Sequence, residues 1–232
     1  MSKKALVLSS GGIDSTTCLS IAIDELGTEN VSTVSIFYGQ RHNKELEQAE
    51  KIAEYYRVIN YQLDLSEVMR YNKNCTLLSN NHQEIDHSSY AEQIEKSKDG
   101  IVDTYVPFRN GLMLSAVASL AVSIYPDDET DIYLGAHADD VAVAAYADCT
   151  IDFTEAIGKA INLGTYGKVN VKAPLINLNK TEVIKRGIEL DAPYHLTWSC
   201  YEGQDKPCET CGTCLDRLRA FEENGLIDPI LK

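Results

Sequence analysis

The residues with the clearest chemical use lie near the amino terminus, where positions 6–17 read LVLSSGGIDSTT. An apolar run ends in a polar, glycine-rich stretch made of Ser9, Ser10, Gly11, Gly12, Ile13, Asp14, Ser15, Thr16 and Thr17. A strand that leads through glycines into a helix presents backbone N–H groups at the positive end of the helix dipole, where phosphate binds. We therefore predict that this stretch, called the glycine loop below, binds phosphate.

The glycine loop lacks the lysine of the most common nucleotide-binding pattern, G-x-x-x-x-G-K-[ST]. Lysine-assisted transfer of a terminal phosphate is therefore not indicated. The alternative interpretation is an ordinary strand-to-helix turn, in which Asp14 or Ser15 only caps the helix.

A second chemical cluster lies near the carboxyl terminus. Cys200, Cys208, Cys211 and Cys214 form a C-x7-C-x2-C-x2-C pattern, and the other three of the seven cysteines are scattered. Four thiolates at short spacing suit a closed tetrahedral zinc site, which has no open position for catalysis. An iron–sulfur cluster is the competing interpretation of such cysteine pairs. We predict zinc, closing a turn-rich segment over about residues 195–220.

Further polar residues occur where a parallel α/β fold presents ligand-binding groups. Arg41 and His42 follow a predicted strand, and Arg109 and Asn110 stand at the start of a predicted helix, where they could bind phosphate or carboxylate. The alternatives are a solvated loop for the first pair and, for the second, a helix start capped by Asn110.

The segment GAHADD supplies further candidates at the end of a strand near residue 135. Asp139 and Asp140 could bind magnesium or accept hydrogen bonds from the N–H edge of a purine-like ring, although capping of a helix would also explain one of them. Lys180 could contact phosphate, and the alternative is a solvated lysine in the first turn of a helix.

Strand-like and helix-like patterns alternate through the first two thirds of the chain and would position these residues. We predict strands at 4–10, 31–38, 58–65 and 131–136, and helices at 15–26, 43–56, 110–125 and 150–163. Such alternation predicts an α/β fold with a doubly wound, mainly parallel sheet and ligands bound beyond the carboxyl ends of the strands. Residues 66–103 and 198–214 lack this periodicity, and we interpret 1–232 as one domain.

Composition limits the classes of function. The chain has 232 residues and a net charge of −14, from 21 basic and 35 acidic residues, with no basic cluster, so we expect no nucleic-acid partner. The longest weakly polar run, 112–125, is too short to cross a bilayer, and the start lacks the pattern of a signal peptide. We therefore expect a cytoplasmic protein without a membrane partner; we also predict a homodimer.

The string SGGIDSTT resembles the S-G-G-x-D-S signature of the PP-loop ATP pyrophosphatases. The resemblance implies that the loop holds the β and γ phosphates of ATP as a pyrophosphate leaving group, while a substrate attacks the α phosphate and becomes adenylated. Asp14 would then lie close to Mg²⁺, which prefers hard oxygen ligands. Adenylation with release of pyrophosphate is a chemistry that needs no Walker lysine.

Six segments in order resemble one branch of this superfamily, the QueC family of 7-cyano-7-deazaguanine synthases. They are SGGIDSTTC, YGQRH, VPFRN, YADCTIDF, LNKTEV and TWSCYEG, which leads into the cysteines. The resemblance implies a Rossmann-like fold, a zinc ion at the cysteines, and conversion of 7-carboxy-7-deazaguanine, ammonia and ATP to the nitrile. Many members have glycine where this chain has Phe108, and GVCETD where it has GAHADD.

Carried over to this chain, the resemblance implies the following roles. Asp14, Ser15 and Arg109 would be catalytic, and ATP would be bound by the glycine loop together with Arg41 and Lys180. Contacts to the deazaguanine substrate are assigned to Arg109, Asn110, Asp139, Asp140, Tyr146 and Asp148. Of these, Tyr146 and Asp148 match a family segment, whereas Asp139 and Asp140 are placed by position alone.

The resemblance leaves three alternatives for function. The chain could be a tRNA-modifying or sulfur-transferring pyrophosphatase, a relative that stops at the 7-amido product, or a non-catalytic nucleotide-binding regulator. For the nitrogen source we predict free ammonia, because four of the seven cysteines are assigned to metal and no second catalytic domain is expected in 232 residues to release ammonia from glutamine.

Overall fold

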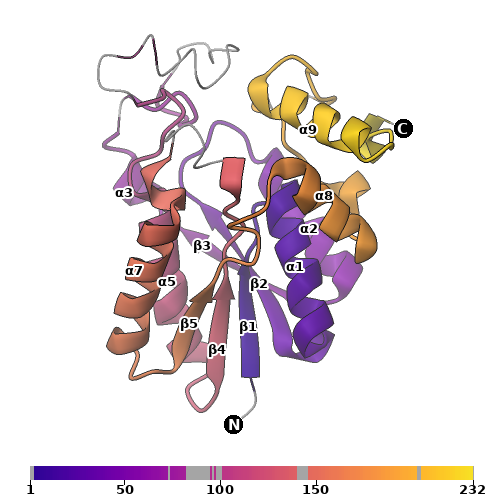
Figure 1. Cartoon of the computed structure of the whole chain (residues 1–232). Coiled ribbons are helices and arrows are strands. Elements are labelled where there is room, and N and C mark those ends of the chain that lie inside the picture. Colours follow the sequence, from indigo (N-terminus) through magenta and orange to yellow (C-terminus); the bar gives the residue numbers. More distant parts are fainter. Residues whose placement is uncertain are drawn as a thin grey trace.

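A sheet of five parallel strands forms the centre of the molecule (Figure 1). The computed structural model describes residues 3–72, 74–81, 95, 97, 101–139, 146–202 and 205–231. The strands are β1 (Lys3–Leu8), β2 (Val31–Phe37), β3 (Ile59–Asp64), β4 (Glu129–Tyr133) and β5 (Val169–Lys172), and their order in the sheet is β3-β2-β1-β4-β5. The chain winds outward from β1 in both directions, so the order reverses between β1 and β4. In such sheets, ligands bind beyond the carboxyl ends of the strands at this switch point.

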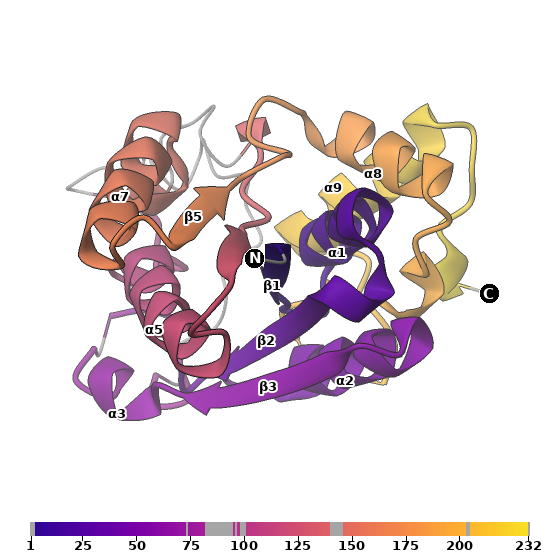
Figure 2. The ribbon, with the colours of Figure 1, turned by 90° about the horizontal axis from the view of Figure 1, so that it is seen from below.

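Helices cover both faces of the sheet, as the view from below shows (Figure 2). The helices α5 (Arg109–Ile124) and α7 (Ile151–Gly164) lie on one face; α1 (Ile13–Leu26), α2 (Lys44–Tyr56) and α8 (Lys180–Glu189) lie on the other. Each face has its own apolar core, built around Leu19, Ile52 and Ile184 on the α1 side and around Leu114, Val117 and Ile161 on the other. This arrangement confirms the predicted doubly wound α/β fold.

Burial explains why α1 and the inner strands form where the sequence predicts them. The apolar stretch of β1 is covered on both faces, with Leu6 and Val7 inaccessible to solvent, as is usual for a parallel strand. Buried residues occur almost all round the first part of α1, because β1, β2, β4 and α8 pack about it. The predicted strands and helices are all present, with ends shifted by a few residues.

The carboxyl-terminal part contains elements that the sequence analysis did not predict. They are β5, which has only four residues, and the helix α9 (Gly212–Glu223), whereas α8 begins at Lys180, the lysine that the sequence analysis also interpreted as part of the first turn of a helix. Helix α9 packs on α8 above the carboxyl ends of the strands (Figure 1). Four short 3-10 helices complete the described elements: η1 (Thr28–Asn30), η2 (Ala147–Cys149), η3 (Tyr194–Leu196) and η4 (Pro229–Leu231).

The irregular stretch 66–103 has local structure where it is described. It begins with α3 (Ser66–Met69), and Met69, Cys75 and Leu78 form a small buried cluster with Tyr38 and Val106. Residues 73, 82–94, 96 and 98–100 of this stretch lie outside the described residues. Within the described parts, no helix is long and apolar enough to cross a membrane.

Candidate active site at the carboxyl end of the sheet

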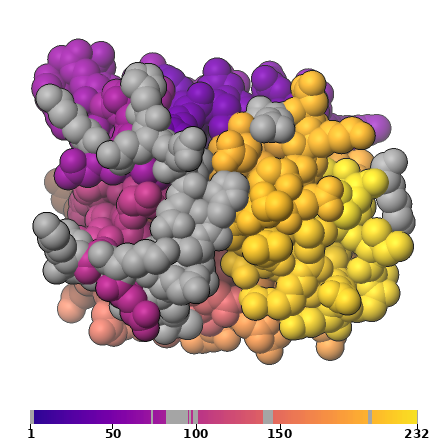
Figure 3. All heavy atoms as spheres, turned by 90° about the horizontal axis from the view of Figure 1, so that it is seen from above, coloured from indigo at the N-terminus to yellow at the C-terminus, as the bar shows by residue number. Residues whose placement is uncertain are grey.

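A cleft of about 660 Å³ opens at the carboxyl end of the sheet, at the switch point between β1 and β4. The glycine loop forms one wall of the cleft, and the segments after β2 and β4 form others. The last part of the chain, light orange to yellow, covers one side of this end of the molecule (Figure 3). The residues of this part that line the cleft are Trp198, Ser199, Tyr201, Gly212, Thr213, Leu215, Asp216 and Arg219.

The glycine loop is fitted tightly against α2. Gly11 has a φ of +83°, and a Cβ there would lie 2.1 Å from the carbonyl oxygen of Glu45 and 2.8 Å from the backbone nitrogen of Ala49. Only glycine permits both the left-handed conformation and this contact between two backbones. Gly12 is the N-cap of α1, and no side chain caps the helix there. The first N–H groups of a helix have no partner within it, so those of α1 are not satisfied by a capping side chain.

Asp14, in the first turn of α1, makes an ion pair across the cleft. Both of its carboxylate oxygens accept hydrogen bonds from Lys180 Nζ at 2.7 Å, and His137 Nε2 lies 3.8 Å from Oδ2. Burial acts to raise the pKa of the Asp14 carboxyl, but Lys180 and His137 outweigh it and hold this pKa below its usual value. Asp14 is therefore an ionised group facing the cleft and not a helix cap.

The other loop residues divide into two groups. Ser9, Ser10, Gly12, Ile13 and Ser15 line the cleft together with Asp14. Thr16 and Thr17 do not line it: both are fully buried, and their hydroxyls donate to the carbonyls of Gly12 and Ile13 within α1. The rotation of the helix turns these side chains into the core, and their contact with the nucleotide stays a prediction.

Five helices begin at the cleft. A residue from the first turn of each lines it: Ile13 of α1, Glu45 of α2, Arg109 of α5, Lys180 of α8 and Gly212 of α9. The start of α8 is well defined, because Asn179 and Glu182 form a reciprocal capping box. Positive ends of helix dipoles attract anions, so this convergence favours a polyanionic ligand despite the acidity of the whole chain.

Arg109 is a second cation of the cleft. It stands at the start of α5, on the other face of the sheet from α8, which begins with Lys180. Its guanidinium lies 5.7 Å from the ring of Tyr38 and takes part in none of the ion pairs within the described part of the chain. Burial acts to lower the pKa of Arg109, but the acidic groups around it, led by the Tyr38 hydroxyl, raise it, so Arg109 stays charged. Such a cation suits an anionic group of a ligand.

Arg41 and His42 also line the cleft, held by backbone carbonyls. Nε and Nη2 of Arg41 donate to the carbonyl of Asn81, at 3.2 and 2.8 Å. His42 Nε2 lies 3.1 Å from the carbonyl oxygen of Tyr201, and burial lowers the pKa of the ring. Since a carbonyl only accepts, neutral His42 carries its proton on Nε2.

The predicted substrate contacts are only partly brought together. Asn110, Asp139 and Tyr146 line the cleft. Asp148 is buried and does not line it: its Oδ2 accepts from the backbone nitrogen of Asn110 at 2.8 Å, and its carbonyl from the Asn110 amide at 3.0 Å. Asp148 thus holds the start of α5, and with it Arg109, while its contact with the substrate stays a prediction. Asp140 lies outside the described residues.

Phe108 is one of the residues at which this chain departs from the pattern of the family that it resembles. It precedes α5 with a φ of +55°, in the left-handed region that favours glycine. Its ring lies over Gly111, where a Cβ would come within 2.4 Å of it. The glycine that many members have at position 108 fits this backbone conformation, and the phenylalanine here occupies it with part of its ring exposed.

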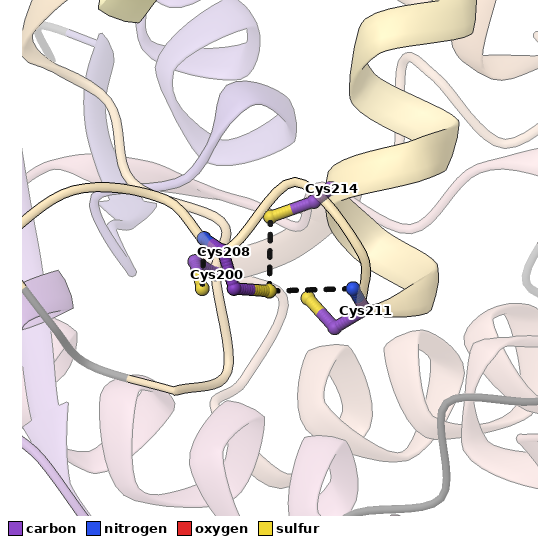
Figure 4. Close-up of side chains that lie close together, drawn as sticks. All are labelled: Cys200, Cys208, Cys211 and Cys214. Carbon is purple, nitrogen blue, oxygen red and sulfur yellow. Dashed lines mark hydrogen bonds between the residues drawn. The ribbon is translucent and has the colours of Figure 1, made fainter.

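The four carboxyl-terminal cysteines form one compact cluster (Figure 4). Their sulfurs all lie within 4.8 Å of one another, and the Sγ atoms of Cys208 and Cys214 are 4.0 Å apart. Four sulfurs about 2.3 Å from one zinc ion would be separated by roughly 3.8 Å. The backbone nitrogens of Cys208 and Cys211 donate to Sγ of Cys200 and Cys208, at 3.3 Å each, as expected for sulfurs that carry negative charge. The donor set fits a single tetrahedral ion.

The segment that carries these cysteines contacts both the glycine loop, through a hydrogen bond, and α2, through a cation–π contact. The backbone nitrogen of Trp198 donates to the carbonyl of Gly11 at 2.9 Å, and Lys44 Nζ lies 5.2 Å from the centre of the Trp198 ring. The buried pair of Arg217 and Asp228, at 2.6 Å, fixes the other side of the segment, because Arg217 also donates to Thr197. The cysteine cluster therefore supports one wall of the cleft.

Several cleft residues were missed by sequence reasoning. Glu45, Trp198, Asp216 and Arg219 all line the cleft. Glu45 stands in an amphipathic helix and Arg219 in an unpredicted one, where charged residues are ordinary surface residues. The only available signals were the proximity of Glu45 to the YGQRH segment and that of Trp198 to the cysteines.

Together, the sheet order, the glycine loop and the converging helix starts define a doubly wound α/β protein with a cleft at the switch point of its sheet. A family model described as "Queuosine biosynthesis protein QueC" matches residues 4–225. The chain therefore belongs to the QueC family.

Similar relatives carry one name, 7-cyano-7-deazaguanine synthase. The relative from Archaeoglobus fulgidus is 38% identical, covering 98% of this chain and 90% of its own length. That from Acetivibrio thermocellus is 41% identical and covers 98% and 97%. Solved structures are more distant: NMN synthetase from Francisella tularensis has 12% identity and a TM-score of 0.49 over 97% of this chain and 77% of that one, a likeness too remote to bear on function.

Proposed function

We propose that this protein is an enzyme that makes 7-cyano-7-deazaguanine from 7-carboxy-7-deazaguanine and ammonia at the expense of ATP. Membership of a family whose similar relatives are named 7-cyano-7-deazaguanine synthase supports the product. The observation that carries the assignment to a site is the Asp14–Lys180 pair, which lies with Arg109 in one cleft at the starts of five helices. Such a cleft can hold a triphosphate beside a carboxylate.

The chemistry follows from the weakness of a carboxylate as an electrophile. In the proposal, the substrate carboxylate attacks the α phosphate of ATP, and pyrophosphate leaves. The acyl adenylate then has a good leaving group, AMP, for attack by ammonia, which makes the reaction carbon–nitrogen ligation. A second activation, at the amide oxygen, permits loss of AMP and formation of the nitrile. Catalysis rests on positioning and on stabilisation of charge, because no protein nucleophile is needed.

Each group of residues has a separate part in this proposal. The unpaired N–H groups at the start of α1, together with Ser10, Ser15 and Lys180, hold the departing pyrophosphate. Arg109 holds the carboxylate of the substrate, and Asn110, Asp139 and Tyr146 lie where the rest of the ring would be. Arg41 lines the cleft and contributes to the binding of ATP in this proposal.

Two metals fit the donor sets present. Asp14 offers a carboxylate beside the phosphate site, and Mg²⁺ binds through one or two carboxylates plus phosphate oxygens, where it would neutralise charge on the leaving group. No group of three carboxylate or histidine ligands occurs in the described part of the chain, which agrees with a magnesium ion that arrives with ATP. Zn²⁺ at the four cysteines would have no open position and would serve structure.

The direct test is mass spectrometry of products formed from ATP, ammonium and 7-carboxy-7-deazaguanine. The proposal predicts AMP, pyrophosphate and the nitrile. Accumulation of the amide alone would identify a relative that stops at that product, and absence of both would refute the function. Ammonia-free glutamine should not yield glutamate, and light scattering should show the predicted homodimer.

A further inference from the structure

Glu45 lines the cleft, but the function proposed above assigns no role to it. It lies in the first turn of α2, directly after the YGQRH segment. Its backbone carbonyl touches the glycine loop, since a Cβ on Gly11 would be only 2.1 Å away. This close contact fixes the start of α2, and with it the position of Glu45, against the proposed phosphate site.

The Glu45 carboxylate differs from the other acidic groups of the cleft in its hydrogen bonds and ion pairs, although the charge of Arg109 acts on it. It takes part in none of the side-chain hydrogen bonds or ion pairs within the described residues. Asp14 is occupied by Lys180, Asp139 accepts from the backbone nitrogen of Lys180 at 2.8 Å, and Asp216 pairs with Arg219 at 3.0 Å. Glu45 is thus a carboxylate in the cleft that is available to a cationic ligand.

The proposed reaction supplies such a cation. Ammonia is mainly ammonium at neutral pH, and ammonium has no lone pair with which to attack a carbonyl carbon. A site that uses free ammonia therefore needs an anionic group to bind the cation and a base to remove one proton. We propose, resting on the function proposed above, that Glu45 binds ammonium in the cleft and takes its proton.

The electrostatic environment of Glu45 suits this role. Burial raises the pKa of its carboxyl to about 7, and Arg109 only partly opposes this effect. A base whose pKa lies near the working pH is the most effective in proton transfer. The titratable groups that face this part of the cleft are Arg109 from α5, Tyr38, Arg41 and His42 from the end of β2, Asp14 from α1 and Tyr201 from the cysteine segment.

The proton and electron balance of the step is simple. An N–H bond of ammonium breaks, its proton passes to the Glu45 carboxylate, and its electron pair stays on nitrogen. That pair forms the bond to the acyl carbon, while the bond from this carbon to the AMP oxygen breaks and its electrons leave with AMP. The nitrogen then releases its surplus proton to water, and Glu45 returns its own proton to water before the next turnover.

The test compares Glu45→Gln with Glu47→Gln, a matched change in the same helical turn at an exposed position that does not line the cleft. At neutral pH, kcat/KM for ammonium should fall about 100-fold in Glu45→Gln and stay unchanged in Glu47→Gln. The defect should shrink as pH rises, because free ammonia then becomes abundant. Pyrophosphate formation without ammonia and conversion of the 7-amido compound should persist in both variants.

The outcomes separate this proposal from the function on which it rests. If the unmodified protein forms nitrile while Glu45→Gln has the same dependence on ammonium, the role of Glu45 is refuted. Equal loss of pyrophosphate formation in Glu45→Gln would also refute it, by placing Glu45 at the nucleotide. If the unmodified protein forms no product at all, it is the proposed function that fails.

Discussion

The glycine loop and the cysteine segment, here Trp198–Cys214, form two walls of one cleft, yet they are held in opposite ways. The loop is set between β1 and α1, over a core that includes Ile13, Leu19 and Ile52. The cysteine segment has only a small buried cluster, formed mainly by Trp198 and the cysteines themselves. Regular elements position the first wall, whereas thiols and the proposed metal position the second. The glycine loop, which carries the proposed chemistry, and the cysteine segment, which supports the cleft, are thus far apart in the chain. The hydrogen bond from the backbone nitrogen of Trp198 to the carbonyl of Gly11 joins them.

The largest effect is expected from Asp14→Asn, which removes a charge from the first wall with almost no change in volume. Pyrophosphate release should be abolished, because Asp14 would no longer offer a carboxylate to magnesium. The lost ion pair with Lys180 should cost about 2 kcal/mol of the free energy of unfolding, so the protein should remain folded. Turnover assays and urea denaturation measure the two quantities. Near-normal turnover would remove Asp14 from the chemistry.

The next effect concerns the second wall. Cys211→Ser should lower the bound zinc from one per chain to almost none, and thermal stability and ATP binding should fall with it. Cys75→Ser is the control, since Cys75 is a buried thiol outside the cluster and its loss should leave zinc content unchanged. Metal analysis and calorimetry make the comparison. Iron at cluster stoichiometry, or stable metal-free protein, would contradict the zinc site.

Gly11→Ala tests how closely the glycine loop packs against the backbone of α2. The added Cβ would overlap the backbone of α2, and the cost should exceed about 4 kcal/mol of unfolding free energy. Gly167→Ala is a close control: its φ is +79° and nothing lies within 4 Å, so only the conformational cost of about 1 kcal/mol applies. Similar losses in the two variants by urea denaturation would mean that the loop moves away from α2 easily.

The last prediction is a pH dependence of stability at Glu45. Because burial raises the pKa of this carboxyl from 4.5 to about 7, its contribution to stability is complete below its unfolded value and is lost as pH rises through 7. Glu45→Gln should therefore gain stability relative to the unmodified protein between pH 5 and pH 8. Denaturation curves at both pH values measure the gain, and parallel profiles would show that Glu45 is well solvated.

The parts of the molecule that could be predicted from the sequence are those with local signals. The alternation of apolar runs and amphipathic helices located eight elements, and the spacing of the cysteines predicted their clustering. The four-residue β5 was missed because so short a run has no measurable period. The burial of Thr16, Thr17 and Asp148 could not be predicted, because a motif gives an order of residues but not the direction of each side chain. For Glu45 the sequence offers only its proximity to the YGQRH segment, since its environment is made by Gly11 and Arg109, which are distant in sequence.

The most direct test of the account is hydrogen exchange with and without ATP and magnesium. If both regions are walls of one nucleotide cleft, backbone amides of the glycine loop and of the cysteine segment should be protected together by the nucleotide. The unmodified protein should show this joint protection, and Asp14→Asn should lose it in both regions. Protection of the glycine loop alone would contradict the claim that the cysteine segment builds the active cleft.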